Sequence, residues 1–348
     1  MKRLIVCCDG TWNRADQQSN GTPCPTNVVK LAYRVAKRDD HDVPQIVYYD
    51  QGVGTGNVLD RFSGGAFGSG LDDNIFDAYR FLIANYEPGD EVFLFGFSRG
   101  AFTARSIGGM IRKCGVLQRT HVNLYIDALR LYRSADIHPD DGDAVQFRSQ
   151  NSCCGADPVF IKCIGVWDTV GALGIPLRGL RALTQGEHRF HDTELSGIVQ
   201  YAFHALAIDE RRAPFMPTLW DEKPKPSQTV SQTWFPGVHS DVGGGYAQNA
   251  LSDITLQWMI DNAAMAGLAF DRDVLAGRPL HGNPTGVLHN SKTGFYRLTP
   301  GESRTISVTR SQTVHPSAIA RWDQDPSYRP GTLRNFFKEV GDARADAH

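Results

Sequence analysis

The stretch FLFGFSRGAFTAR, residues 93–105, places Ser98 between two glycines directly after a run of apolar residues. Its first half has the composition of a buried strand, and residues 101–113 have the apolar spacing of a helix. Gly96 and Gly100 fit a sharp strand-to-helix turn, because larger side chains two residues from the serine would collide there. The stretch therefore predicts a serine held in a strained turn at the end of a strand.

Short apolar runs alternate with amphipathic segments along the rest of the chain. The predicted strands lie at 4–8, 45–49, 91–96, 159–167 and 232–235, with a weaker one at 305–309. The predicted helices lie at 27–37, 72–86, 101–113, 196–207 and 253–266. Strands that are apolar on both faces and are separated by helices are typical of a parallel sheet covered on both sides. The predicted fold class is therefore α/β, with a mostly parallel sheet and helices on both faces.

A chain of 348 residues with 41% hydrophobic residues is long enough for one large domain. We predict a single domain over residues 1–340, with inserted lid or cap segments at 55–70, 119–155 and 175–230 and a flexible tail at 341–348. The first of these segments is rich in glycine but lacks the GK[ST] ending of a phosphate-binding loop. We expect it to be a mobile loop beside the site.

Three residues with complementary chemistry follow predicted strands, in the chain order Ser98, Asp168 and His239. The loops after the carboxyl ends of parallel strands form the ligand crevice of such a sheet. A histidine beside a serine takes the serine proton, and an aspartate orients that histidine and stabilises its charged form. The order is that of the α/β-hydrolase triad, so we predict an α/β-hydrolase-like fold with nucleophile Ser98, base His239 and acid Asp168.

Other side chains compete for two of these roles. Asp209 and Asp241 are rival acids, and His204 is a rival base within the apolar segment YAFHALAI. A histidine in such surroundings is more typical of packing, and the run DERR at 209–212 is more typical of a salt-bridged cluster than of catalysis. His239 is favoured because, of the eleven histidines, only this one follows a predicted strand inside a glycine-rich loop, and Asp168 is favoured because it lies just beyond a predicted strand in the chain order of the triad.

Two backbone N–H groups are predicted to stabilise the negative oxygen that forms during acyl transfer. The N–H of Arg99 lies at a helix start, where free N–H groups and the helix dipole favour negative charge. The second donor comes from the loop DGTW after the first strand, where Thr11 is the natural candidate and Gly10 lets the backbone bend. The residues expected to support the site are Asp9, Gly10, Gly96, Gly100 and Asp241.

The composition excludes several classes of function. The chain has 36 basic and 38 acidic side chains and a net charge of −2, without the concentrated basic charge of nucleic-acid binders or a polybasic membrane segment. Its seven cysteines include no CxxC pair, which favours small core residues in a reducing compartment over a disulfide framework or a zinc site. We expect no cofactor and no resident metal, with a divalent ion near Asp9 and Asp241 left open.

The first residues, MKRLIVCCDGTW, contain an apolar run that is too short for a signal peptide, and no window approaches a membrane-spanning length. We expect a soluble protein that is cytoplasmic or exported by a route that needs no signal peptide. The oligomeric state and peripheral contact with a membrane are left open.

Two other functions fit parts of the sequence. Cys8 and Arg14 have the C-x5-R spacing of cysteine phosphatases, but a cysteine replaces the usual preceding histidine, and Cys8 ends a strand, where buried thiols are common. The other alternative is a non-catalytic binding or assembly protein, since a fold does not fix a function. A binding protein has no need of an intact triad, which favours the hydrolase.

Six blocks of the sequence resemble, in the same order, the α/β-hydrolase family that includes the catalytic domains of type VI secretion phospholipase effectors. The blocks are VCCDGTWN, YYDQGVGTG, FGFSRGAFTAR, GVWDTVGALG, HALAIDERRAPF and PGVHSDVGGGY. The similarity runs from residue 1 to about residue 265, with a weaker echo in VHPSAIARW.

The resemblance implies esterase or lipase chemistry and a Ser98–Asp168–His239 triad. The effectors cleave acyl esters of glycerophospholipids, whereas this chain is shorter and lacks their long membrane-binding additions. We therefore expect a serine hydrolase of carboxylic acyl esters, with a small-molecule, lipid or phospholipid-like ester as its substrate.

Overall fold

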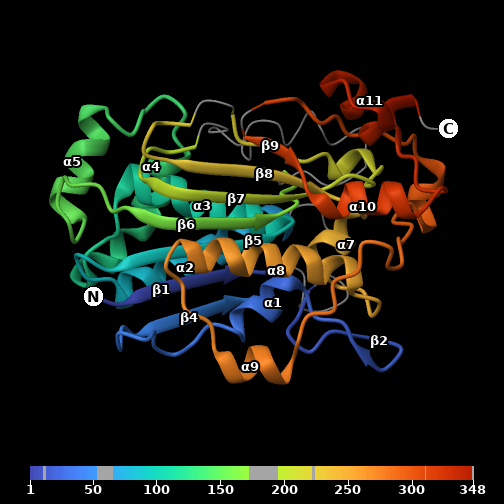
Figure 1. The fold of residues 1–348 in the computed structure, drawn as a ribbon. Helices are drawn as coiled ribbons and strands as arrows, with labels where there is room; N and C mark the ends of the chain where they lie inside the picture. The colour runs from blue at the N-terminus through green and yellow to red at the C-terminus, as the bar shows by residue number, and fades with distance from the viewer. Residues whose placement is uncertain (11–12, 53–65, 172–194, 222–223, 310, 347–348) are drawn as a thin grey trace.

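The computed structural model describes residues 1–10, 13–52, 66–171, 195–221, 224–309 and 311–346. Within these residues a seven-stranded sheet runs through the centre of the molecule, in the order β4–β1–β5–β6–β7–β8–β9 (Figure 1). Every neighbouring pair of strands in it is parallel. The predicted α/β class with a parallel sheet is therefore confirmed.

The strands of this sheet are β1 (Arg3–Cys8), β4 (Gln45–Asp50), β5 (Glu91–Phe97), β6 (Ile161–Trp167), β7 (Val199–Ala207), β8 (Thr229–Phe235) and β9 (Gln312–Val314). A separate small hairpin joins β2 (Gln18–Ser19) and β3 (Thr22–Pro23). The sheet register sets Phe97 opposite Trp167. These two residues directly precede Ser98 and Asp168, so the serine and the aspartate lie at the same edge of the sheet.

Helices cover both faces of the sheet. One face carries α2 (Ala66–Asn85) and α3 (Arg99–Cys114), and the other carries α1 (Asn27–Ala32) and α8 (Ala250–Met265) (Figure 1). Side chains of successive strand residues point to opposite faces. Leu4 and Val6 accordingly pack with α2 and α3, whereas Ile5 packs with α1 and α8. The central strands β1, β5 and β6 are largely apolar on both faces because both of their faces are buried.

The part of the chain that the structure describes contains further helices. They are α4 (Tyr125–Arg133), α5 (Gly142–Asn151), α7 (His239–Gly243), α9 (Arg272–Gly277), α10 (Pro316–Gln324) and α11 (Gly331–Val340), with short 3-10 turns at η2 (Arg119–Leu124), η3 (Ala213–Phe215), η4 (Gly294–Leu298) and η5 (Ala343–Asp346). The carboxyl-terminal helices enclose a third apolar cluster, in which Trp234 of β8 packs with Trp322 and Phe337.

Two predicted elements are wrong. Residues 196–207, predicted as a helix, contain strand β7 between β6 and β8. Every residue from Ala202 to Ala207 is buried, and a run that is apolar on all sides lacks the periodicity that separates a strand from a helix. Residues 305–309 form no strand; the last strand is β9 instead. Arg304 to Ser307 alternate between buried and exposed as a strand would, but their backbone joins no described sheet.

The predicted lid segments have different outcomes. Segment 119–155 contains α4 and α5, which contact α3. Segment 175–230 includes β7, so that part belongs to the sheet rather than to an insertion, and residues 175–194 lie outside the described residues. Most of segment 55–70 also lies outside them, and its last residues begin α2. In the expected tail, Arg344 forms ion pairs with Asp323 and Asp342.

Candidate active site

Ser98 occupies the turn between β5 and α3, as the flanking glycines predict. Its backbone has φ 58° and ψ −119°, a left-handed φ that residues other than glycine seldom adopt. The Ser98 N–H donates to the carbonyl oxygen of Trp167 over 3.0 Å, which joins the turn to the end of β6. The side chain makes no capping hydrogen bond to α3. The Ser98 hydroxyl in this strained turn is therefore not engaged in capping α3.

Gly96 and Gly100 are required by the close packing of this turn. A Cβ on Gly96 would lie 2.3 Å from the carbonyl oxygen of Gly100. A Cβ on Gly100 would lie 2.1 Å from the carbonyl oxygen of Cys8 and 2.4 Å from that of Asp9. The contacting atoms are backbone atoms of α3 and β1, which have no freedom to move aside. The two glycines let the serine turn approach the end of β1.

Asp168 and His239 form a buried pair at the carboxyl ends of β6 and β8. The Nδ1 of His239 donates to the Asp168 Oδ2 over 2.6 Å, and the two residues are 4% and 0% exposed. Asp168 follows β6 and has a left-handed φ of 41°. His239 begins α7, the short helix after β8, and its ring packs against Phe97 and Phe215. A histidine that donates from Nδ1 keeps a lone pair on Nε2, which is the state of a general base.

Arg304 binds the same carboxylate from its other side, and no pattern in the sequence pointed to it. Its Nη1 donates to the Asp168 Oδ1 over 2.6 Å, and its Nη2 donates to Oδ2 over 2.9 Å. The backbone N–H of Ala207 also donates to Oδ1, over 3.0 Å. The Asp168 carboxylate thus accepts hydrogen bonds from β7, from α7 and from the irregular segment that holds Arg304.

These contacts set the charges of the pair. Burial alone would raise the pKa of Asp168, but the Arg304 guanidinium and the hydrogen bond from His239 outweigh it and hold this pKa well below its ordinary value. Burial lowers the pKa of His239, and the contact with Asp168 opposes this effect without overcoming it. At neutral pH the aspartate is therefore ionised and the histidine is neutral, as proton abstraction requires.

Within the run DERR, predicted to be a salt-bridged cluster, Glu210 and Arg212 form an ion pair. Glu210 is 1% exposed and accepts two hydrogen bonds from the guanidinium of Arg212, at 3.0 and 2.8 Å. It also accepts from the backbone N–H of His239, over 3.3 Å, and from the Ser291 hydroxyl, over 2.9 Å. Glu210 therefore fixes the start of α7, a role next to the site that the sequence analysis did not assign.

The rival acids and the rival base are engaged elsewhere. Asp209 accepts from the backbone N–H of Gly237 and from the hydroxyl of Tyr328. Asp241 lies 2.5 Å from the Nδ1 of His289, so it pairs with a different histidine. His204 is fully buried in β7, and its Nε2 accepts from the backbone N–H of Thr169. Of these acids and histidines, only Asp168 and His239 pair beside the serine turn.

The loop after β1 carries two of the supporting residues predicted for the site. Gly10 lies close to the serine turn, because a Cβ on it would lie 3.3 Å from the Cβ of Ser98. Asp9 is buried and accepts hydrogen bonds from Gly10 N, from the Thr26 hydroxyl and from the Tyr49 hydroxyl. Burial raises the pKa of Asp9 to about 6, although these hydrogen bonds act to lower it. Thr11, the second predicted oxyanion donor, lies outside the described residues.

Asp50, at the end of β4, gives a prediction about stability. Burial raises the pKa of Asp50 to about 7, and the charges of Asp77 and Asp9 add to this effect. A folded-state pKa above the unfolded value means that the ionised carboxylate destabilises the fold as pH rises from about 4 through 7. Asp50→Asn is therefore expected to raise the free energy of unfolding by about 2 kcal/mol near pH 8, roughly half of what the full pKa shift would give because the side chain is only half-buried and water screens its charge. Near pH 4 the substitution is expected to change little.

Urea denaturation at the two pH values measures this difference. Asp77→Asn is the matched control, because its side chain is 54% exposed and its removal relieves only part of the repulsion. An equal effect of Asp50→Asn at both pH values would contradict the electrostatic explanation.

The cysteines do not supply a nucleophile at this edge of the sheet. All seven are free thiols, and Cys8 is 1% exposed. Burial raises the pKa of Cys8 well above its ordinary value. The thiolate is the nucleophilic form of cysteine, and a raised pKa keeps Cys8 protonated. A cysteine phosphatase that uses Cys8 and Arg14 is therefore disfavoured. Among the described residues, no group of three or more metal-ligating side chains gathers, at Asp9 and Asp241 or elsewhere.

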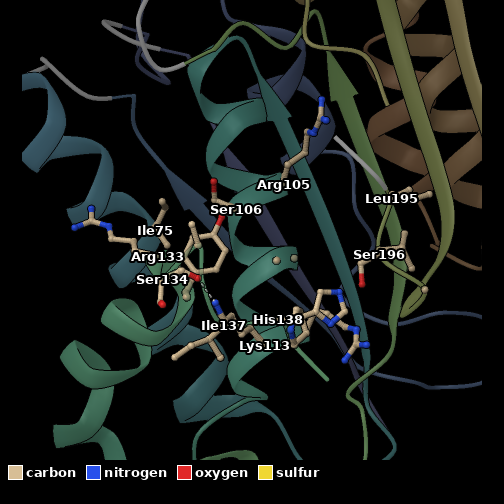
Figure 2. Close-up of a pocket in the computed structure, with 18 of the residues that line it drawn as sticks. Ile75, Arg105, Ser106, Lys113, Arg133, Ser134, Ile137, His138, Leu195 and Ser196 are labelled. Carbon is tan, nitrogen blue, oxygen red and sulfur yellow. Dashed lines mark hydrogen bonds between the residues drawn. The ribbon is translucent and has the colours of Figure 1, made fainter. Parts of the chain in front are cut away.

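A cavity of about 550 Å³ lies along α3 (Figure 2). Its wall is partly apolar, with Ile75 and Leu195, and partly cationic, with Lys113. The Nζ of Lys113 donates to the carbonyl oxygen of Ser134 over 2.6 Å (Figure 2). None of the three predicted triad residues lines this cavity.

No helix in the described part of the chain is long and apolar enough to cross a membrane.

The sequence over residues 2–262 matches the family described as the catalytic domain of Tle1-like phospholipase effectors of the type VI secretion system. This chain belongs to that family. The six blocks that carry the predicted resemblance all lie within the matched residues, so the resemblance is confirmed. Arg304 lies beyond the Tle1-like match.

Among curated proteins, the chain is similar to the uncharacterized protein YEL023C of Saccharomyces cerevisiae, with 30% identity over 271 residues. The alignment covers 72% of this chain and 37% of the yeast protein, so this chain spans little more than a third of that relative's length.

Two solved structures show a weak likeness to this Tle1-like chain. The crystal structure of an uncharacterized protein from Pseudomonas aeruginosa has a TM-score of 0.45 and 19% identity, and the match covers 78% of this chain and 46% of that one. The structure of the Tle1 effector bound to the VgrG spike of the type 6 secretion system has a TM-score of 0.41 and 21% identity, with 70% and 51% covered. Membership of the family rests on the sequence match.

Proposed function

We propose that this protein is a serine hydrolase that cleaves carboxylic acyl esters of lipids, with phospholipids as the preferred class. One observation carries the proposal: a strained Ser98 turn and a buried Asp168–His239 pair lie at the carboxyl ends of β5, β6 and β8 of one parallel sheet. The description of the Tle1-like family as phospholipase effectors supports the lipid substrate.

The reaction begins with attack by the Ser98 Oγ on the ester carbonyl carbon. His239 Nε2 takes the hydroxyl proton as the bond forms, and Asp168 stabilises the imidazolium. The carbonyl oxygen becomes an oxyanion, which the backbone N–H of Arg99 at the start of α3 stabilises, with a second N–H from Thr11. His239 then returns the proton to the leaving alcohol, and the acyl group stays on Ser98. Water, deprotonated by His239, releases the fatty acid and restores the serine.

The first experiment uses a fluorophosphonate probe, which reacts with activated serines. We expect stoichiometric labelling at Ser98, mapped by peptide mass spectrometry, together with fatty-acid release from phosphatidylcholine vesicles. Cys8→Ala is the matched control and is expected to keep both signals, because the Cys8 thiol is buried. Labelling with turnover of short p-nitrophenyl esters alone would exclude the phospholipid substrate. An unlabelled protein that hydrolyses no ester would favour a binding function.

A further inference from the structure

We propose that Arg304 is a positioning residue of this hydrolase, which fixes the Asp168 carboxylate and thereby sets the basicity of His239. The inference rests on the proposed function, because it assigns a role within the same Ser98 site. It adds a fourth side chain to the predicted three, contributed by a segment of the chain that the Tle1-like match does not include.

The geometry of Arg304 is a two-pronged contact with the carboxylate. Both terminal nitrogens donate to Asp168, one to each oxygen, at 2.6 and 2.9 Å. Such paired contacts between guanidinium and carboxylate fix the plane as well as the position of the carboxylate. The Oδ2 atom receives Arg304 and His239 together, so the arginine determines where the hydrogen bond to the histidine is made.

Arg304 is itself held in place from several directions. Its Nη1 also donates to the Ala207 carbonyl oxygen over 2.7 Å, and its Nη2 donates to that of Phe215 over 2.5 Å. Its own carbonyl oxygen accepts from the Thr332 hydroxyl of α11 over 2.8 Å. The residue is 2% exposed. The guanidinium is therefore a rigid cation whose place depends on both β7 and the carboxyl-terminal helices.

The charge of Arg304 has a direct consequence for the base. The charged groups that face His239 are Asp168 at the end of β6, Glu210 and Arg212 after β7, and Arg304 behind the Asp168 carboxylate. Both carboxylates favour the imidazolium, and both guanidiniums oppose it. Loss of the Arg304 charge leaves the full negative charge of Asp168 facing the ring, which raises the pKa of His239. A neutral histidine then requires a higher pH.

The test measures kcat/KM for a p-nitrophenyl ester against pH, with the wild type, Arg304→Gln, Arg304→Lys and Arg321→Met. In Arg304→Gln the acidic limb of the profile is expected to move upward by about one pH unit, and kcat at the optimum to fall by roughly 10–100-fold. Arg304→Lys keeps the positive charge but not the paired contact with both carboxylate oxygens. The acidic limb of its pH profile is therefore expected to stay near the wild-type position, while kcat falls. Arg321→Met is the control: Arg321 is a buried arginine that binds the carbonyl oxygens of Pro284 and Gly286, and its loss leaves the limb in place.

The outcomes separate this inference from the proposed function. A wild-type protein with no esterase activity contradicts the proposed function itself. If the wild type is active but the acidic limb of Arg304→Gln lies at the wild-type pH, the inference is contradicted, because loss of a merely structural arginine lowers activity equally at every pH. If Arg304→Gln does not fold, Arg304→Lys decides through the downfield proton NMR signal of the His239 Nδ1–H, which reports the hydrogen bond to Asp168. A shifted signal with a reduced kcat supports the positioning role, and an unshifted signal overturns it.

Discussion

Ser98→Ala is expected to lower kcat for ester hydrolysis by roughly 10⁶-fold, since the hydroxyl that forms the acyl-enzyme is lost. The fold is expected to persist, because the Ser98 side chain makes no capping hydrogen bond to α3 and the backbone that shapes the turn is unchanged. The residual rate comes from binding and from oxyanion stabilisation, which act without the nucleophile. Steady-state hydrolysis of a p-nitrophenyl ester, with thermal unfolding of both proteins, measures the two quantities.

Ser106→Ala is the matched control for this substitution. Ser106 lies two turns further along the same helix and is 1% exposed, so it loses a hydroxyl of equal size away from the turn. Its kcat is expected to stay within a few-fold of wild type. Turnover that survives in Ser98→Ala would refute the nucleophile and with it the acyl-enzyme.

Asp168→Asn is expected to lower kcat by roughly 10⁴-fold, since a carboxamide neither stabilises the imidazolium nor holds the tautomer that leaves Nε2 free. The same substitution should also lower the free energy of unfolding by about 3–5 kcal/mol, because Arg304 is left buried without its counter-charge. The folded-state pKa of Asp168 is depressed, so this stabilisation is present above the unfolded pKa and is lost only as pH falls through the folded value. Denaturation near pH 7 therefore measures it in full.

Asp209→Asn separates this effect from the loss of any buried aspartate. Asp209 accepts both of its hydrogen bonds, from Gly237 and Tyr328, at Oδ2, and the carbonyl oxygen of an asparagine is able to accept both. Activity is expected to remain near wild type, since Asp209 does not touch His239. A large loss of activity here, with little loss in Asp168→Asn, would reverse the assignment of the acid.

Local chain signals predicted the serine turn well. Glycine is required on either side of Ser98 because a larger residue would collide with the turn itself or with the end of β1. The pentapeptide and the apolar run before it are therefore enough to predict the turn. The order of the elements then suggested Asp168 and His239, because parallel strands bring their carboxyl ends to one edge. The structure adds the contact between these two side chains, which spacing along the chain does not give.

The misses arise where tertiary context replaces local pattern. Residues 202–207 of β7 are all buried, so this part of the strand shows no alternation of apolar and polar residues that would distinguish a strand from a helix. Arg304 lies in an irregular segment, and its significance comes from meeting Asp168 across more than a hundred residues of chain. The run DERR predicts a structural ion pair at Glu210, but the contact of Glu210 with the backbone N–H of His239 depends on how α7 starts after β8.

The short strand β9 has a practical consequence for the preparation of this protein. β9 covers the outer edge of β8, and the cluster behind it buries Trp234 with Trp322 and Phe337. A fragment trimmed at residue 262, where the family match ends, would present β8 as an open edge with an uncovered tryptophan. Open apolar edges template association between chains. Such a fragment is expected to precipitate during expression, so a minimal soluble form has to extend through α11.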